Sequence, residues 1–319
     1  MARKRRQGTQ GTNGTGAGSG ATTDVVQGLG PDGAGAGTAD SAVAAGRGVW
    51  PSLKRFFSRH SPRYFAGLVC VALCLAVLAL PSPYVIESPG PTQDVLASVD
   101  GRQVIGIKGV KTYKSRGKLL LLTANVQGIP GSPAMGWQTL IAWFDPHQEV
   151  LPTEAVFPVG QSAKDYEKDS SKEMTGSQDS AGAAALAFAR SRGIDVKGAK
   201  VSMHVDDIGG PSAGMMYALG VIDKLTPADE TGGRVIAGTG TISKSGKVGQ
   251  IGSIRLKMLG ARRDGATWFL APASNCDEVV GHVPAGLRDV RVSTLADAYK
   301  AVKAIGSGQG GLLPHCTAA

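Results

Sequence analysis

The chain has 319 residues, of which 42% are apolar and 18% charged, and this composition suits a globular protein of one or two domains. Residues 1–64 contain nine Lys or Arg and three Asp, so +6 of the net charge of +9 lies there. The remainder has no stripe of Lys and Arg and few aromatic residues, which argues against nucleic-acid binding.

The N-terminal part predicts a tail followed by a membrane anchor. Residues 1–48 are rich in Gly, Ala, Thr and Ser and too poor in large apolar side chains to fold, so we expect a disordered tail. A basic flank, 49–63, precedes an apolar stretch, and we predict a transmembrane helix over 64–83.

The charges around this stretch predict its orientation. Basic residues stand at positions 54, 55, 59 and 63 before it, and the first charges after it are acidic. The positive-inside rule then predicts a single-pass protein of the cell membrane, with a cytoplasmic tail and an extracytoplasmic C-terminal part. A cleaved signal peptide is the alternative, but the lead of about 60 residues is too long for one and no A-x-A site precedes Pro81.

Residues 84–165 predict a mixed α/β region, followed by an Ala-rich helix. The expected elements are strands at 104–110 and 118–126, a short helix at 135–144, a charged loop at 165–172 and a helix at 173–192. Whether 84–165 folds separately or packs on the C-terminal half of the chain is left open by the pattern.

From residue 199 onward, strands and helices alternate. We predict strands at 199–205, 233–242, 267–272 and 287–293, a hairpin turn at 243–249, and helices at 211–225, 254–265, 275–283 and 294–305. Such alternation is typical of a layered α/β fold, so we expect one domain over 166–306, with its core at 199–306 and a flexible tail at 307–319.

Two cysteines near the C-terminus leave an alternative open. If this part of the chain lies outside the cytosol, Cys276 and Cys316 could form a disulfide that ties down the tail; otherwise both stay reduced. No CxxC pair and no cluster of Cys and His suggests zinc.

The segment GGPSAG at 209–214 predicts a tight turn that brings Ser212 to the start of a helix. Backbone N–H groups at that place have no helical partner and can stabilise a developing oxyanion. A serine there can be a nucleophile, or it can simply cap the helix, and the segment alone supports both interpretations equally.

A nucleophilic serine needs a base, and Lys257 is a candidate. None of the five histidines lies in a recognisable triad motif. Lys257 sits among apolar residues of a predicted helix, where burial would lower its pKa. Taken alone, a lysine in such a setting is more often a surface residue whose aliphatic stem covers apolar neighbours.

Three motifs in the second half of the chain resemble the proteolytic domain of Lon proteases. They are GGPSAG, then IAGTGTIS leading into VGQIGSIRLKMLGA, and finally GATWFLAP. The segments YVIESPGPTQDV and KEMTGSQDSAGAAAL look like the membrane-anchored Lon-like proteins of Gram-positive bacteria. The resemblance implies an α/β fold like that of ribosomal protein S5, preceded here by one transmembrane helix.

The resemblance also implies the roles of individual residues. Ser212 matches the nucleophile of the PSAG motif, Lys257 matches the catalytic lysine, and Thr239 matches the threonine expected to hydrogen-bond that lysine. Gly210 and Pro211 form the turn whose backbone would help to bind the oxyanion.

The chain departs from the family pattern in three places. Ser253 replaces the second glycine of IGG, and Gly209 replaces an acidic residue found in many Lon proteases, while Asp206 and Asp207 lie nearby without an assigned role. The relatives usually carry a PDZ domain before the peptidase domain, but here only SRGIDVKGA fills that place. We therefore expect no PDZ domain.

These observations predict a membrane-anchored serine endopeptidase that cleaves extracytoplasmic proteins or peptides with a Ser–Lys dyad. The chain has no G-x-x-x-x-G-K-[ST] motif, so we expect ATP-independent cleavage with no cofactor and no metal. The expected partners are polypeptide substrates, the membrane through one transmembrane helix and, in some arrangements, further copies of the chain; nucleic acid is not expected.

Two rival functions remain. The departures at Ser253 and Gly209 and the missing PDZ domain favour a catalytically inactive Lon-like scaffold that binds polypeptides at the membrane. A small-molecule kinase is the other, since S5-like folds occur among kinases whose glycine- and serine-rich loop holds phosphate. No metal-binding acid or second phosphate motif supports the kinase.

Overall fold

A mixed sheet forms the centre of the fold in this computed structural model, which describes residues 58, 61–99, 101–204 and 210–318. The chain divides into two units, Met1–Phe65 and Ala66–Ala319, and the sheet belongs to the second. In spatial order the strands are β12 (Arg288–Val292), β11 (Trp268–Pro272), β8 (Val235–Gly238), β5 (Lys118–Gln127), β1 (Tyr84–Asp94) and β6 (Glu149–Pro152).

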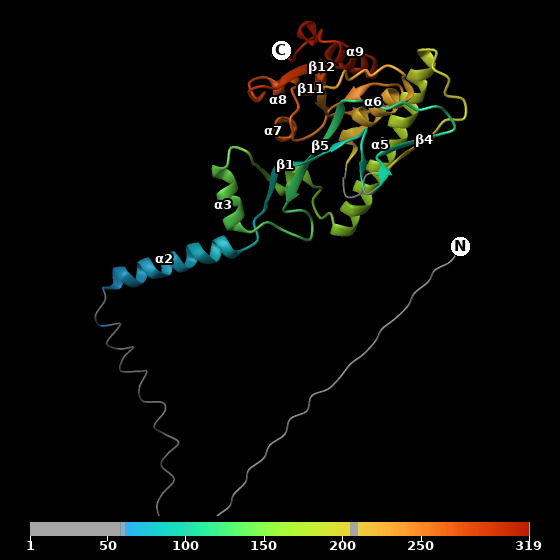
Figure 1. Ribbon diagram of the computed structural model, residues 1–319. Coiled ribbons are helices and arrows are strands. Elements are labelled where there is room, and N and C mark those ends of the chain that lie inside the picture. Colours follow the sequence, from blue (N-terminus) through green and yellow to red (C-terminus); the bar gives the residue numbers. More distant parts are fainter. Residues whose placement is uncertain (1–57, 59–60, 100, 205–209, 319) are drawn as a thin grey trace, which may run out of the picture. The chain divides into compact units, whose positions relative to one another are not determined.

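The sheet is parallel on one side and antiparallel on the other (Figure 1). β12, β11, β8 and β5 run parallel, whereas β1 pairs antiparallel with both β5 and β6. Because the sheet combines strands from 84–152 with strands from 235–292, the region 84–165 and the C-terminal half of the chain share one core.

Short strand pairs and helices complete the described part of the chain. The pairs are β2 (Ser98–Val99) with β3 (Arg102–Gln103), β4 (Ile105–Lys108) with β7 (Lys200–Met203), and β9 (Thr241–Ile242) with β10 (Val248–Gly249). The α-helices are α2 (Pro62–Ala79), α3 (Gly136–Phe144), α4 (Thr153–Val156), α5 (Ala163–Ser191), α6 (Gly214–Leu225), α7 (Ile254–Arg263), α8 (Cys276–Val279) and α9 (Leu295–Gly306). The 3-10 turns are η2 (Pro211–Ala213), η3 (Ala273–Asn275) and η4 (Gly310–Leu312).

Strand β5 explains how the two faces of the sheet are filled. Leu119 and Leu121 point into the core formed with α5, α6 and α9, and Leu120 and Leu122 point into the core formed with α7 and α8. A strand that is covered on both faces needs apolar side chains at successive positions, which is why LLLL is continuous here. The strand expected at 118–126 is confirmed.

Strand β1 was not expected from the sequence. It contains Pro89 and Pro91, which cannot donate to a ladder and usually mark an edge strand or a bulge. Here the register with β5 shifts between Pro89 and Thr92, so an irregularity accommodates the prolines inside the sheet. This strand carries Glu87 toward the site described below.

The charged loop expected at 165–172 is wrong. Helix α5 begins at Ala163, because the Ser162 hydroxyl accepts a hydrogen bond from the backbone N–H of Asp165 at 3.2 Å and so caps the helix. The helix therefore has about three turns before the start of the helix predicted at 173–192. The strand expected at 233–242 is also interrupted, because the chain turns at Gly240 between β8 and β9.

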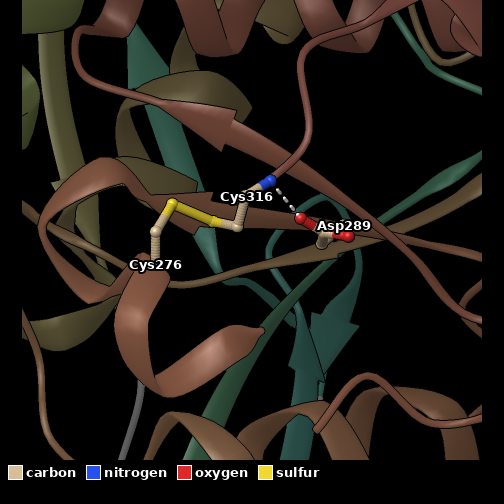
Figure 2. The surroundings of a disulfide bond; sticks show 3 residues. All are labelled: Cys276, Asp289 and Cys316. Carbon is tan, nitrogen blue, oxygen red and sulfur yellow. Dashed lines mark hydrogen bonds between the residues drawn. A yellow bond between two sulfur atoms is a disulfide. The ribbon is translucent and has the colours of Figure 1, made fainter. Parts of the chain in front are cut away.

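The end of the chain is tied to the domain, rather than forming the flexible tail expected from residue 307. Cys276 and Cys316 form a disulfide, and the backbone N–H of Cys316 donates to the Asp289 carboxylate at 2.7 Å (Figure 2). The N–H of Arg291 also donates to the carbonyl of Pro314. The structure therefore decides the open alternative in favour of the disulfide.

Removing this disulfide is expected to destabilise the domain. The bond closes a loop with a sequence separation of 40, and a loop of that size corresponds to about 3–4 kcal/mol of stability. The replacement of both cysteines by alanine should lower the free energy of unfolding in urea by that amount, and reductant should do the same to the unmodified chain. Cys74→Ser is the control, because Cys74 is free. An unchanged urea midpoint in the double variant would contradict the prediction.

Helix α2 has the length and composition of a membrane span. Its 18 residues have a mean hydropathy of 1.9 and none of them is buried. Among the described residues it is the helix that meets these criteria. The expected tail at 1–48 and most of the basic flank lie outside the described residues.

Candidate active site

Ser212 lies in the η2 turn that leads into α6. Ala213, and not Ser212, occupies the N-cap position of α6, and no side-chain cap bond forms there. The structure therefore excludes the alternative that Ser212 merely caps this helix. Gly210 precedes the turn with a φ of 92°, a conformation that side chains rarely adopt, so the second glycine of GGPSAG is required by the backbone.

The end of strand β8 holds the backbone of this turn. The Thr239 hydroxyl donates to the carbonyl oxygen of Ser212 at 3.1 Å, and the N–H of Gly240 donates to the same oxygen at 2.8 Å. The carbonyl of Gly240 accepts in return from the N–H of Met215 at 3.0 Å. This exchange replaces the strand ladder at Gly240, which explains why the strand predicted through 242 breaks there.

Helix α5 supports the turn from another side. The Ser177 hydroxyl donates to the carbonyl of Pro211 at 3.0 Å. A Cβ at Gly214 would come within 2.8 Å of the Ser177 hydroxyl and of an Ile242 methyl group, so α6 begins in close contact with α5 and β9. Sequence reasoning assigned no role to Ser177, although it lies in the KEMTGSQDSAGAAAL segment noted for its resemblance.

Lys257 is buried on α7, which packs against β1 and β5 on the other face of the sheet. Only 5% of the residue is exposed. Burial lowers the pKa of Lys257 to about 8, while the nearby Glu87 carboxylate acts in the opposite direction. A lysine with this pKa is partly neutral near physiological pH, and only the neutral amine can accept a proton.

Ser253 connects the start of α7 to Glu87. It occupies the N-cap position with φ 58° and ψ 35°, the left-handed conformation that glycine adopts most easily. Its hydroxyl donates to the Glu87 carboxylate at 2.5 Å, and Glu87 is itself buried. The side chain at this departure from IGG therefore has a partner, and Glu87 is a site residue that sequence reasoning missed. Its position within YVIESPGPTQDV was the signal that could have found it.

Glu87→Gln is expected to move the pH dependence of Lys257. Removing the carboxylate charge removes an influence that raises the lysine pKa, so the pKa should fall below about 8. We expect the pH at which the Lys257 amine titrates to fall by up to about one unit. The Gln amide can still accept the Ser253 hydrogen bond, and a titration of the Lys257 amine by NMR from about pH 6 to 10 tests the shift. An upward shift would contradict this electrostatic role.

The predicted site residues are brought together only in part. Thr239 is bonded to Ser212 through its carbonyl, and Gly210 and Pro211 form the turn. Within the described residues, the side chain of Lys257 forms no hydrogen bond with Ser212 or Thr239. The orienting role of Thr239 therefore stays a prediction, although its oxygen keeps acceptor capacity. Gly209, Asp206 and Asp207 lie outside the described residues.

A groove of about 820 Å³ lies beside the turn. It is lined by Gly210, by residues 124–126 of β5 and by the N-terminal turns of α5, including Tyr166, Asp169 and Glu173. β8 pairs with β5 only as far as Leu120, whereas β1 pairs with β5 as far as Gln127. Among the described strands none continues the ladder on the β8 side beyond Leu120.

The side chains at the site offer acid–base and nucleophilic groups. In the part of the chain that the structure describes, no group of three or more His, Cys, Asp or Glu side chains is placed to hold a metal ion. The candidate chemistry rests on a hydroxyl at a helix start and a buried amine with a lowered pKa.

Comparison with known proteins relates much of this chain to proteases. A family model described as the Lon protease (S16) C-terminal proteolytic domain matches residues 125–305. Lon protease 2 of Herpetosiphon aurantiacus is 40% identical over 103 residues, which are 29% of this chain and 12% of that protein. Lon protease of Clostridioides difficile is 38% identical over 80 residues, 25% of this chain and 10% of that protein.

A eukaryotic relative matches to a similar extent. The mitochondrial Lon protease homolog of Yarrowia lipolytica is 37% identical over 98 residues, 29% of this chain and 8% of that protein. The matched part thus spans about a tenth of the length of these curated relatives.

Proposed function

Because the chain belongs to the Lon protease (S16) C-terminal proteolytic domain family, we propose that it is a serine endopeptidase in which Ser212 is the nucleophile and Lys257 the general base. The single observation that carries this proposal is the buried Lys257 with its pKa lowered to about 8. A lysine with only a structural role usually keeps its charged amine exposed to water. A lysine that acts as the base for a serine must instead lose its proton near neutral pH.

The proposed reaction is acyl transfer. Neutral Lys257 takes the proton of the Ser212 hydroxyl as its oxygen attacks the peptide carbonyl, and backbone N–H groups at the helix start stabilise the oxyanion. The lysine then protonates the leaving amine, and water hydrolyses the acyl-enzyme. Thr239 and Ser177 hold the turn at Ser212 and Pro211, so the nucleophile keeps its orientation throughout.

In this proposal, the hydrogen bond between Ser212 and Lys257 forms when a peptide substrate binds. An extended peptide can add to β5 along the edge beyond Leu120, with main-chain hydrogen bonds that do not depend on its side chains. Its carbonyl would then enter the groove beside Gly210. Catalytic hydrogen bonds are often long without substrate and shorten when it binds, which fits the absence of a Ser212–Lys257 bond among the described residues.

We further propose that cleavage is ATP-independent and occurs outside the membrane to which α2 anchors the chain. The absence of a P-loop motif supports the first part, and the length and hydropathy of α2 support the second. In this proposal no unfolding motor acts on the substrates, which would then be unfolded or flexible segments of extracytoplasmic polypeptides.

A fluorophosphonate probe tests the proposed site directly. We expect one adduct, mapped to Ser212 by mass spectrometry of the full chain in lipid nanodiscs, and the labelling rate should rise through about pH 8 as Lys257 loses its proton. Ser245→Ala is the matched control, because Ser245 lies on the exposed β9–β10 turn and its loss should leave labelling unchanged.

The absence of an adduct in folded protein at every pH from about 6 to 10 would sink the proposal. The chain would then be better described as a catalytically inactive scaffold that binds polypeptides through the β5 edge.

A further inference from the structure

Helix α3 carries its apolar face toward solvent. Trp137, Leu140, Ile141 and Phe144 stand at i, i+3, i+4 and i+7, so they form one stripe, and their exposed fractions run from 42% to 83%. The adjacent Trp143 is 59% exposed. In a surface helix of a soluble protein, a stripe with this spacing normally faces the core. In α3 it is the apolar face that points to solvent.

The opposite side of α3 is already used for packing. Thr139 and Ala142 are its buried residues, and Ala142 packs in a small cluster with Ile86 and Ala134. Since small side chains fill the contact with the domain, the large apolar side chains are not needed for the core. Their exposure therefore calls for a partner outside the fold.

The beginning of α3 is joined to the end of α2. The N–H of Gly136 donates to the Leu80 carbonyl at 2.9 Å, and the N–H of Ser82 donates to the Ala134 carbonyl at 2.7 Å. A Cβ at Gly136 would come within 2.8 Å of the Val77 carbonyl oxygen, so this close approach requires glycine. Figure 1 shows α3 beside the C-terminal end of α2.

The chemistry of the exposed stripe matches the boundary of a bilayer. The nine residues GWQTLIAWF contain no charge, and the Trp143 ring packs against that of Tyr84, just beyond α2, with centroids 5.7 Å apart. Trp and Tyr are enriched at membrane–water interfaces, where an apolar ring with a polar edge suits both phases. A helix with one strongly apolar face can lie in that interface.

We propose that α3 is an interfacial helix that lies in the outer leaflet of the membrane crossed by α2, with the stripe and Trp143 among the lipid chains near the headgroups. The inference rests on the membrane anchoring proposed above. The bonds between Gly136 and Leu80 keep α3 at the level where the span ends. Contacts of both α2 and α3 with the bilayer would fix the orientation of the domain. They would also hold the groove at a fixed distance from the membrane surface.

Quenching by brominated lipids tests this placement in the full chain. Trp50→Phe provides a background in which Trp137, Trp143 and Trp268 remain. In nanodiscs whose lipids are brominated near the headgroup, we expect a marked loss of tryptophan fluorescence. Further substitution with Trp137→Phe and Trp143→Phe should remove this quenchable component, because Trp268 lies in the sheet.

Charge on the stripe provides a second variant. Phe144→Glu should reduce the quenching of Trp143, since a carboxylate is expelled from the lipid, and it should not unfold a domain in which Phe144 is 83% exposed. Leu312→Glu is the matched control, because Leu312 is also apolar and exposed but lies on η4, and quenching should be unchanged.

A reporter in α2 separates the possible failures. Leu73→Trp, placed in the chain without Trp50, Trp137 and Trp143, should be quenched by bromines near the chain ends if α2 spans the bilayer. Quenching of this reporter without quenching of the α3 tryptophans would overturn the inference and leave the anchoring intact; the stripe would then cover another protein or copy. If neither the reporter in α2 nor the α3 tryptophans are quenched, both the anchoring and the inference are overturned.

Discussion

Ser212→Ala is expected to abolish peptide hydrolysis while leaving the fold unchanged. Loss of the nucleophile from a serine peptidase lowers kcat by about four orders of magnitude or more. The Ser212 side chain makes no hydrogen bond within the described residues, and the bonds that hold the turn go to its carbonyl oxygen, which alanine keeps. The free energy of unfolding should therefore change by no more than about 0.5 kcal/mol.

The measurement is hydrolysis of an unfolded protein and of a fluorogenic peptide by the full chain in nanodiscs, together with urea unfolding of the same samples. Ser245→Ala should behave as the unmodified chain, because Ser245 is exposed on the β9–β10 turn. If Ser212→Ala keeps its activity, another residue is the nucleophile and the proposed dyad is wrong. If it loses both activity and stability, the serine has a structural role that the described contacts do not explain.

Lys257→Met is expected to remove activity and to stabilise the domain at neutral pH. The folded-state pKa of about 8 lies below the value of 10.5 for a free lysine, so folding carries a cost whenever the lysine must be protonated. At about 1.4 kcal/mol per pKa unit, the cost below pH 8 is on the order of 3 kcal/mol. Methionine fills a similar volume without a charge, so the variant avoids that cost.

The pH dependence of this gain follows from proton counting. Between about pH 8 and 10.5 the unfolded chain binds more protons at this position than the folded chain, so the stability of the unmodified chain rises with pH through that window. The Met variant lacks this dependence. The difference in stability between the two should be largest below pH 8 and should disappear above about 10.5.

Urea unfolding of the two chains at about pH 7 and about pH 9.5 tests the prediction, and the comparison of differences cancels the titration of other groups. Lys247→Met, a change on the β9–β10 hairpin, should alter neither activity nor stability by a comparable amount. If Lys257→Met is less stable than the unmodified chain at neutral pH, the lysine is held by a favourable charge partner and is a structural cation.

The two expected effects together describe a conflict between stability and function at one position. A charged amine buried on α7 is a poor choice for packing, since burial disfavours the charged form. Glu87 and Ser253 lessen the conflict, because the carboxylate favours the charged lysine and is itself bonded to the Ser253 hydroxyl. The same pair would thus set where on the pH scale the base becomes neutral.

The sequence by itself determined those helices and strands whose deciding residues all lie close together in the chain. LLLL within 118–127 predicts a strand covered on both faces, and the helix at 295–306 begins with a capping box in which Thr294 and Asp297 bond each other's backbone N–H groups. The helix predicted at 135–144 is also confirmed. In each of these, the residues that decide the structure lie within a few positions of one another.

Sequence also supplied the candidate chemistry, since the motifs that resemble Lon proteases single out Ser212 and Lys257, whose local settings alone left their roles open. Tertiary structure decided which side chains surround them. Glu87 reaches Ser253 across a sequence separation of 166 residues, and Thr239 and Ser177 reach the turn at Ser212 from β8 and α5. No local pattern encodes such contacts, because they arise only when the sheet is assembled.

The difference between what the sequence determined and what the tertiary structure decided is clearest for the apolar faces that are exposed. The sequence of α3 determined that an apolar stripe exists, by its i, i+3, i+4, i+7 spacing. Periodicity alone assigns such a stripe to the core, and it was the packing of Thr139 and Ala142 that turned it to the surface. Likewise, the spacing of Cys276 and Cys316 left their pairing open until β12 and α8 brought them together. The sequence determines which faces are apolar, and only the assembled core decides which of them the fold buries, because its limited volume is shared by segments far apart in the chain.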